Sequence, residues 1–475
     1  MTRTLIIGGS VAGLVAALAF ADLGHDVTVL ERDANEAPDT VDEAHGDWQR
    51  PTVPQLHHSH AFGSLGTNLL RERLPSVYQA LVAAGVREIE LGKAMPPTLA
   101  DKTPHPADAE LRMLGSRRTT FELVLRQEAL RKPGISLRRG ETVRGLTVAD
   151  RGPARVTGVV TKDGRTIAAD LVIDASGRRS QGHEWLREHG LAEPELVAQS
   201  ADITYYTRYY RAHGPRPVGP LNRGFGAGGL WDHYTGVMFL GDNNTFAISF
   251  GILPDDTELK QMRAEDVFTS VVRATPLLAP WVSPEASDPI SPVHAMAGLD
   301  NSLKLYGQDA QPVPGFLPVA DAVCTTNPAF GRGVSLAIAH VLGLADLVRE
   351  HPEPDAEQAA LAAGLAGRTF RPWFEDAVRN DAGRARLWRA TVAGQQLPPL
   401  PPDVLTFGTV AEAAGTDEVV WRRLVRTMMS LDNPAGLYED EEIRLRVKQA
   451  VAGGPPPFPA PDRATLVDIV RRAAN

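Results

Sequence analysis

Residues 4–32 read TLIIGGSVAGLVAALAFADLGHDVTVLER. The apolar run before the glycines predicts a buried parallel strand, and the turn at 8–13 leads into an Ala/Leu-rich helix over 11–23. A second strand over 27–30 ends in Glu31. In such a unit the helix N-terminus offers N–H groups and a positive dipole end to a pyrophosphate. The terminal carboxylate can accept hydrogen bonds from an adenosine ribose, so the sequence predicts a dinucleotide site.

The glycine fingerprint departs from its usual form at one position. The expected G-x-G-x-x-G reads Gly8-x-Ser10-x-x-Gly13, so the middle glycine, which lets the backbone approach a pyrophosphate, is serine. A secretory signal peptide is the other reading of this stretch, but Gly8 and Gly9 break its apolar core. The predicted nucleotide contacts are Gly8, Ser10, Val11, Ala12, Gly13, Glu31 and Arg32.

Composition indicates an ordinary globular protein. The chain has 475 residues, 43% hydrophobic and 23% charged, and a formal net charge of −9 without a dense basic patch, which argues against nucleic-acid binding. Cys324 is the single cysteine, so the sequence predicts neither a disulfide framework nor a cysteine metal site. Its apolar runs are too short to span a bilayer, and we expect a cytoplasmic protein with no membrane span and no bound metal.

The pattern along the chain predicts a mixed α/β (α+β) fold in three parts. We expect a discontinuous Rossmann-like domain from 1–180 and 296–350, a β-sheet substrate domain over 181–295, and a C-terminal helical region over 351–475. The expected elements are a long loop at 33–55, helices at 64–85 and 119–131, a small antiparallel sheet at 135–173, a second sheet at 200–252, a strand at 315–320, helices at 331–348, 355–366, 370–392, 416–431, 440–452 and 463–473, and a linker at 455–461.

Two further segments narrow the nucleotide to a flavin. Residues 171–180, LVIDASGRRS, run from a buried strand into a small-residue turn. Residues 315–334, GFLPVADAVCTTNPAFGRGV, place Asp321 at the end of a strand, where it can accept from a ribityl hydroxyl. The glycine-rich helix entry that follows can stabilise negative charge at the N1/C2 edge of a reduced flavin. The predicted contacts here are Asp174, Asp321, Pro328, Gly331, Gly333 and Val334.

With these segments the chain resembles the FAD-dependent monooxygenases of the aromatic hydroxylase and squalene epoxidase type, and within them the bacterial polyether-type epoxidases. Four segments carry the resemblance across residues 4–348. They are GGSVAGL with Glu31-Arg32, RPTVPQLHHSH at 50–60, SRRTTFELVLRQEALR at 116–131, and DASGRRS with VADA…NPAFGRG. Besides Ser10, the chain departs from the family at Ala320, where a glycine usually precedes the aspartate.

The resemblance implies both a cofactor and a reaction. Arg118 and the backbone at Val143 would contact FAD, Asp321 its ribityl or pyrophosphate region, and 50–60 would lie along the isoalloxazine ring. Reduced FAD would react with O₂ to give a C4a-hydroperoxide, which epoxidises or hydroxylates an apolar or aromatic small molecule in secondary metabolism. Electrons would come from NAD(P)H or from a partner flavin reductase. The catalytic candidates are His58, His60 and Arg50.

Two motifs allow another interpretation, and three other functions are alternatives to a monooxygenase. The histidines at 57–60 also suit a metal, but no second ligand cluster is visible and we favour the flavin face. Residues 224–229, GFGAGG, match a dinucleotide fingerprint without a strand before or a helix after, so we predict a loop. The alternatives are an FAD-dependent reductase or dehydrogenase, a flavin-dependent halogenase, and a non-catalytic FAD-fold binding protein. The W-x-W-x-I-P segment expected of the halogenase is absent.

Overall fold

The computed structural model describes residues 1–215, 217–307, 310–398, 400–401, 404–451 and 460–474. Its centre is a parallel sheet of five strands. Their order is β18 (Phe316–Pro318), β9 (Leu171–Asp174), β1 (Arg3–Ile7), β2 (Asp26–Glu31) and β5 (Ile135–Arg139). Ile7 is in register with Leu30 and Asp174, so the segments after β1, β2 and β9 leave the same edge of the sheet.

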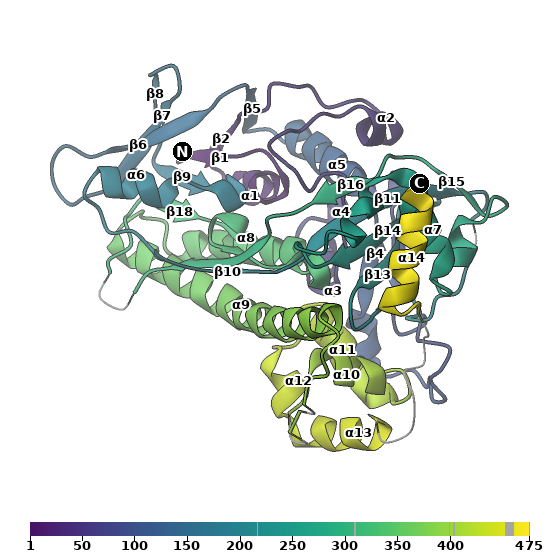
Figure 1. Cartoon of the computed structure of the whole chain (residues 1–475). Helices are drawn as coiled ribbons and strands as arrows, with labels where there is room; N and C mark the ends of the chain where they lie inside the picture. Colours follow the sequence, from purple (N-terminus) through teal and green to yellow (C-terminus); the bar gives the residue numbers. More distant parts are fainter. Residues whose placement is uncertain (216, 308–309, 399, 402–403, 452–459, 475) are drawn as a thin grey trace.

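Helices cover one face of this sheet and a small antiparallel sheet covers the other (Figure 1). The helices are α1 (Val11–Asp22), α5 (Arg118–Arg131) and α8 (Gly333–Glu350), with α3 (Ser64–Arg73) and α4 (Pro75–Ala83) packed beside them. The other face carries β6 (Val143–Val148), β7 (Val156–Thr161), β8 (Thr166–Ala168) and α6 (Gly182–Glu188). Val15, Ala16 and Phe20 of α1 are fully buried, which makes this the main core.

A second, antiparallel sheet occupies the segment for which we predicted a substrate domain, and we call it the substrate sheet. It contains β12 (Gly226–Leu230), β13 (Thr235–Leu240), β14 (Thr245–Ile252), β11 (Thr204–Ala212) and β15 (Ser287–Pro289) in this order, and β16 (His294–Met296) also pairs with β11. Alternate side chains point to opposite faces. Tyr206 and Tyr210 pack into a core with α7 (Glu265–Ala274) and α14 (Arg463–Ala474), while Tyr205 and Tyr209 face the nucleotide domain.

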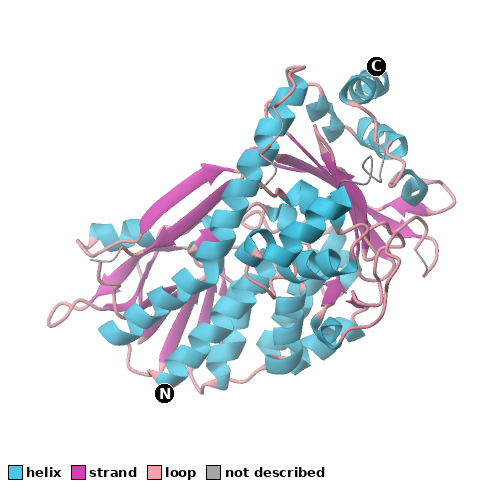
Figure 2. Cartoon of the chain, turned by 90° about the horizontal axis from the view of Figure 1, so that it is seen from below, coloured by secondary structure: helices cyan, strands magenta, loops and turns pink. Residues whose placement is uncertain are grey.

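The remaining elements connect and support the two sheets. They are α2 (Val41–Gly46), β3 (Arg87–Glu90) with β4 (Arg112–Gly115), the connecting strands β10 (Glu195–Ser200), β17 (Asp300–Leu305) and β19 (Cys324–Thr325), and the helices α9 (Ala356–Val392), α10 (Phe407–Ala413), α11 (Glu418–Met428), α12 (Ala435–Glu439) and α13 (Glu441–Val451). Figure 2 shows the strands in two groups, with helices filling the space between them. Among the described residues, no helix has both the length and the apolarity to cross a bilayer.

The predicted α/β fold is confirmed, but several expected elements were wrong. The loop at 33–55 contains α2, which Thr40 starts with a capping box, and the helix at 64–85 is two helices because Pro75 begins a new one. β5 and β9 leave the expected antiparallel sheet at 135–173 and join the parallel one.

Other corrections concern the second half of the chain. The expected loop at 224–229 is largely strand β12, and the helices at 355–366 and 370–392 are one helix, α9, that continues through Pro372. The last helix, α14, packs on α7 of the substrate sheet and not on the C-terminal helices before it (Figure 1). Most of the predicted linker at 455–461 lies outside the described residues.

Candidate active site

The turn between β1 and α1 brings backbone groups closer together than a side chain would permit. Gly8 has φ +102°, and a Cβ there would lie 2.5 Å from the carbonyl oxygen of Ala175. A Cβ on Gly13 would lie 1.9 Å from the oxygen of Gly8. The N–H groups of residues 11–13 have no acceptor inside the helix, so they are directed at whatever lies before its N-terminus. This geometry is a cradle for a pyrophosphate.

Ser10, the unusual residue of the fingerprint, is accommodated without backbone strain. Its φ of −97° and ψ of −165° are extended values that any residue adopts. Its hydroxyl donates to Glu122 Oε2 at 2.8 Å and accepts from Arg118 Nη2 at 2.9 Å. Helix α5 therefore holds this side chain and brings the Arg118 cation to the N-terminus of α1.

Glu31 lies at the end of β2 in a buried cluster of charges. One carboxylate oxygen accepts from the backbone N–H of Gly9 at 3.0 Å and from Arg50 Nη2 at 2.6 Å, and the other accepts from the N–H of Asp33. The Arg50 guanidinium also pairs with Asp33 and with Glu122. Burial alone would raise the pKa of Glu122, but the nearby arginines lower it. The cluster fixes the carboxylate expected to accept from a ribose.

Arg126 indicates whether the residues around Glu31 fit the ADP half of FAD, because it carries buried donors without a partner. It is 3% exposed, and both terminal nitrogens of its guanidinium lack a hydrogen-bond partner among the described residues. It lies over the Trp48 ring at 5.7 Å, and both burial and the neighbouring Arg50 lower its pKa. Unpaired buried donors beside Glu31 are what phosphate or ribose oxygens would satisfy. The glycine turn at 8–13, the Glu31 carboxylate and the unpaired donors of Arg126 together fit the ADP half of FAD.

The next part of the site follows β18. Ala320 has φ +53°, a left-handed value that glycine adopts more readily than alanine. Asp321 follows, and burial raises the pKa of its carboxyl although Arg118 and Arg178 act against this. The predicted ribityl ligand therefore lies near the same arginine that reaches Ser10.

The glycine-rich loop before α8 packs against the segment that was expected to lie along the flavin. Gly331 has φ +65°, and a Cβ on it would lie 2.5 Å from Cβ of Ala61. Pro328 begins a short turn, and Gly333 and Val334 open α8. The start of an 18-residue helix thus lies close to Ala61, next to the histidine segment, where its dipole can act on a developing negative charge.

Asn327 is the point at which three distant elements meet this loop. Its Oδ1 accepts from the Tyr205 hydroxyl at 2.7 Å, and its Nδ2 donates to Asp381 at 2.6 Å. Its backbone N–H donates to Asn301, which also donates to Asp381. All four side chains are buried, so the substrate sheet, β17 and α9 together fix the loop. We did not predict this network, because the sequence indicated only a glycine-rich helix entry at residues 327–333.

The catalytic candidates His58 and His60 lie between the loop and the substrate sheet. His58 is 3% exposed and shares a hydrogen bond of 3.1 Å between Nδ1 and the Thr207 hydroxyl. His60 Nδ1 lies 2.8 Å from the His58 carbonyl, which also accepts from Tyr209. Burial lowers the pKa of each histidine to about 3, so both rings are neutral near pH 7. They can shape the site and share hydrogen bonds, but at neutral pH they do not act as cationic acids.

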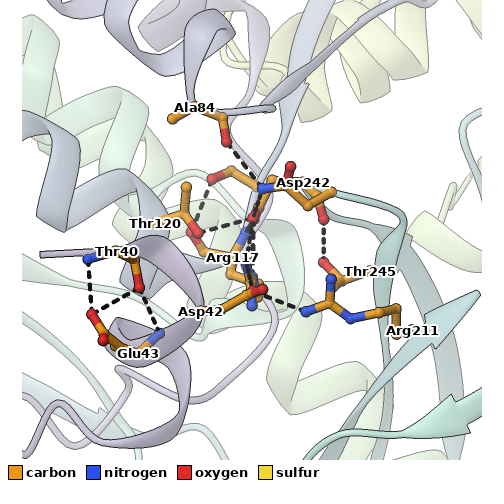
Figure 3. Close-up of polar contacts among 11 residues, drawn as sticks. Thr40, Asp42, Glu43, Ala84, Arg117, Thr120, Arg211, Asp242 and Thr245 are labelled. Atoms are coloured by element: carbon orange, nitrogen blue, oxygen red, sulfur yellow. Dashed lines mark hydrogen bonds and ion pairs between the residues drawn. The ribbon is translucent and has the colours of Figure 1, made fainter. Parts of the chain in front are cut away.

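A buried ion pair docks the substrate sheet onto α5, as Figure 3 shows. Arg117 donates from its guanidinium to Asp242 at 2.7 Å, and its backbone N–H donates to the same carboxylate at 2.6 Å. Thr120 adds a third donor, and Asp42 of α2 joins Arg117 to Arg211 of β11. Because Arg118 is the next residue, the sheet and the cofactor loop are positioned from the same turn of helix.

Three other predicted residues lie away from this centre. Asp174 is fully buried, and its carboxylate accepts from Ser176 and Ser180, so it holds its own turn. Val143 begins β6, close to where the N–H of Glu141 bonds to the Glu31 carbonyl. Arg32 is exposed. Within the part of the chain that the structure describes, no three His, Cys, Asp or Glu side chains are grouped as a metal site.

The sequence is similar to a family model and to a protein of known sequence. A family model described as GIDA, glucose inhibited division protein A, matches residues 3–202. Protein Rv3254 of Mycobacterium tuberculosis is 27% identical over 460 residues, which cover 91% of this chain and 90% of the relative.

Two solved structures share the fold at low sequence identity. PqsL, described as a probable FAD-dependent monooxygenase from Pseudomonas aeruginosa, is 14% identical, with a TM-score of 0.55, and the match covers 82% of this chain and 98% of PqsL. A triple mutant of the flavin-dependent brominase Bmp2 is 14% identical, with a TM-score of 0.60, and the match covers 95% and 99%. The chain therefore shares the fold of these two proteins, which confirms the predicted fold class.

Proposed function

We propose that this protein is an FAD-dependent monooxygenase acting on an apolar or aromatic small molecule. The observation that carries the proposal is the convergence at Asn327. There the loop expected at the flavin edge is bonded to Tyr205 of the substrate sheet at 2.7 Å. The description of PqsL as a probable FAD-dependent monooxygenase supports this choice of chemistry.

Different residues of the site would bind different parts of the cofactor. The N–H groups of residues 11–13 and the Arg118 cation would bind the pyrophosphate, Glu31 would accept from the ribose, and Asp321 would accept from the ribityl chain. FAD, when bound, supplies the redox chemistry and the activation of O₂. The N-terminus of α8 would stabilise negative charge on the pyrimidine side of the ring.

The substrate sheet would cover the ring and exclude water. Thr207 and Ser249 share a hydrogen bond of 2.8 Å, and Ser59 reaches Ser249 at 2.7 Å, which joins the sheet to the histidine segment. The neutral rings of His58, which is buried and bonds to the Thr207 hydroxyl, and of half-buried His60, which bonds to the His58 carbonyl, complete a wall. Such a wall suits a substrate held mainly by apolar contact and oriented by few hydrogen bonds.

We further propose that electrons come from NAD(P)H bound transiently, or from a separate flavin reductase. The second fingerprint, 224–229, supports no nicotinamide site because it runs into strand β12 without a following helix. Epoxidation, hydroxylation and dehydrogenation remain distinct outcomes, and the substrate decides between them.

A flavin-dependent halogenase is the second candidate, since the Bmp2 brominase shares the fold. One assay separates the functions. The purified protein is reduced with dithionite and mixed with O₂ and a panel of alkenes and phenols, with and without bromide. A monooxygenase incorporates one atom of ¹⁸O₂ into product without bromide. Products that form only with bromide would indicate the halogenase, and a product of substrate reduction that forms without O₂ would indicate a reductase.

A further inference from the structure

A hollow lies along the outer edge of β18, beside the loop that carries Asp321. This strand is the last of the parallel sheet, so no further strand covers it. The hollow contains about 640 Å³ of empty space, including its opening to solvent. Its apolar wall is formed by Leu186, Phe316, Leu344 and the small side chains Ala359, Ala362, Ala363 and Ala366.

His340 lines this hollow, and its buried ring has a nitrogen without a hydrogen-bond partner among the described residues. Its ring is 1% exposed, and Nδ1 accepts from the N–H of Ala320 at 3.4 Å, which leaves the proton on Nε2. Nε2 has no hydrogen-bond partner among the described residues. Phe370 packs against the ring with centroids 4.8 Å apart and offers no lone pair. A buried donor without an acceptor is unfavourable, and an acceptor inside the hollow would remove that penalty.

A cation lies in the same wall. The Lys304 ammonium donates to the carbonyl of Ser180 at 3.2 Å and forms no ion pair within the described residues. The neighbouring carboxylate of Asp174 is already occupied by Ser176 and Ser180. Burial lowers the pKa of the Lys304 ammonium, although the nearby carboxylates of Asp174 and Glu184 act in the opposite direction. Its spare hydrogens are free to bind an anion.

We propose that this hollow binds a small monocarboxylic acid, with its apolar body between α8 and α9 and its carboxylate shared by Lys304 and His340. The carboxylate supplies a directly bonded charge partner for Lys304 and the missing acceptor for His340. Because His340 also holds the N–H of Ala320, one residue before Asp321, the ligand lies next to the loop expected to carry the flavin ribityl chain. The site does not depend on the redox chemistry proposed above.

The test uses benzoate and hexanoate as probes on the full-length protein as purified, with binding measured by calorimetry and ligand-observed NMR. We expect saturable binding of the acids and at least about tenfold weaker binding of benzyl alcohol, since a charge-assisted hydrogen bond is lost. Lys304→Met and Ala363→Leu should each weaken acid binding about tenfold or more. Lys260→Met, at an exposed lysine far along the chain, is the matched control.

Two results would overturn the proposal. The first is the absence of saturable acid binding to a folded protein. The second is binding that both Lys304→Met and Ala363→Leu leave unchanged, which would place the acid elsewhere. Two chemically different variants are used so that a folding defect in one, detected by circular dichroism, does not decide the outcome. Failure here leaves FAD binding intact, so it is distinguishable from failure of the proposed function.

Discussion

Replacing Arg117 with methionine removes the buried cation that neutralises Asp242. Both side chains are almost fully buried, at 1% and 0% exposed. Breaking such a pair on one side costs about 3–5 kcal/mol, because the remaining charge stays in a poorly solvated place. Asp242 keeps the donors from Thr120 and the backbone N–H at 117, so we expect the lower end, about 3 kcal/mol. The substrate sheet should then dock less tightly onto α5.

The free energy of unfolding is measured by urea titration, followed by tryptophan fluorescence and by limited proteolysis. The control is Arg73→Met, which breaks an ion pair with Asp346 whose side chains are 38% and 31% exposed. Such a surface pair contributes about 0–1 kcal/mol. A loss at Arg117 no larger than the loss at Arg73 would refute the docking role of the buried pair.

Three further predictions concern the cofactor site. Glu31→Gln weakens a charge-assisted hydrogen bond to ribose, so the FAD dissociation constant should rise about tenfold or more, measured by quenching of flavin fluorescence. Asp381→Asn places an amide donor against the amide donors of Asn301 and Asn327 and should lower the free energy of unfolding by about 1–3 kcal/mol. It should also shift the visible spectrum of bound flavin, whereas a structural defect elsewhere would leave that spectrum unchanged. Folding lowers the pKa of His58 and of His60 to about 3, from a value near 6.5 in the unfolded chain. Acid therefore protonates the unfolded chain first, so the free energy of unfolding is at its full value above about pH 6.5 and falls below it. The decrease is up to about 1.4 kcal/mol per pH unit for each ring. In the His58→Gln variant the urea concentration at the unfolding midpoint should depend less on pH than in the wild-type protein. An equal pH dependence in the two proteins would contradict the argument from burial.

The nucleotide half of the site was predictable because its determinants are local. A strand, a glycine turn, a helix and a terminal carboxylate follow one another within thirty residues, and each is dictated by its own sequence. The structure has β1, α1 and Glu31 where the sequence indicated. Ser10 looked like a weakness, but its hydroxyl is used by Glu122 and Arg118, which lie more than one hundred residues away.

The substrate half was less predictable because its determinants are contacts between distant segments. Asn327, Asn301 and Asp381 are unremarkable in sequence and acquire their meaning only when α9 crosses the loop before α8. The alternation of aromatic residues predicted the two faces of the sheet, since period-two patterning is local. It did not indicate that Tyr205 would bond to Asn327, because pairing between domains leaves no periodic signal.

FAD binding by the intact chain tests the central claim most directly. Protein stripped of flavin is titrated with FAD by calorimetry, alongside Gly13→Leu, whose side chain would fill the cradle where a Cβ already lies 1.9 Å from Gly8. We predict saturable binding of one FAD per chain, a flavin absorbance spectrum, and loss of both in a Gly13→Leu protein that remains folded. Failure of the folded wild-type protein to bind FAD, or equal binding by the Gly13 variant, would contradict the account.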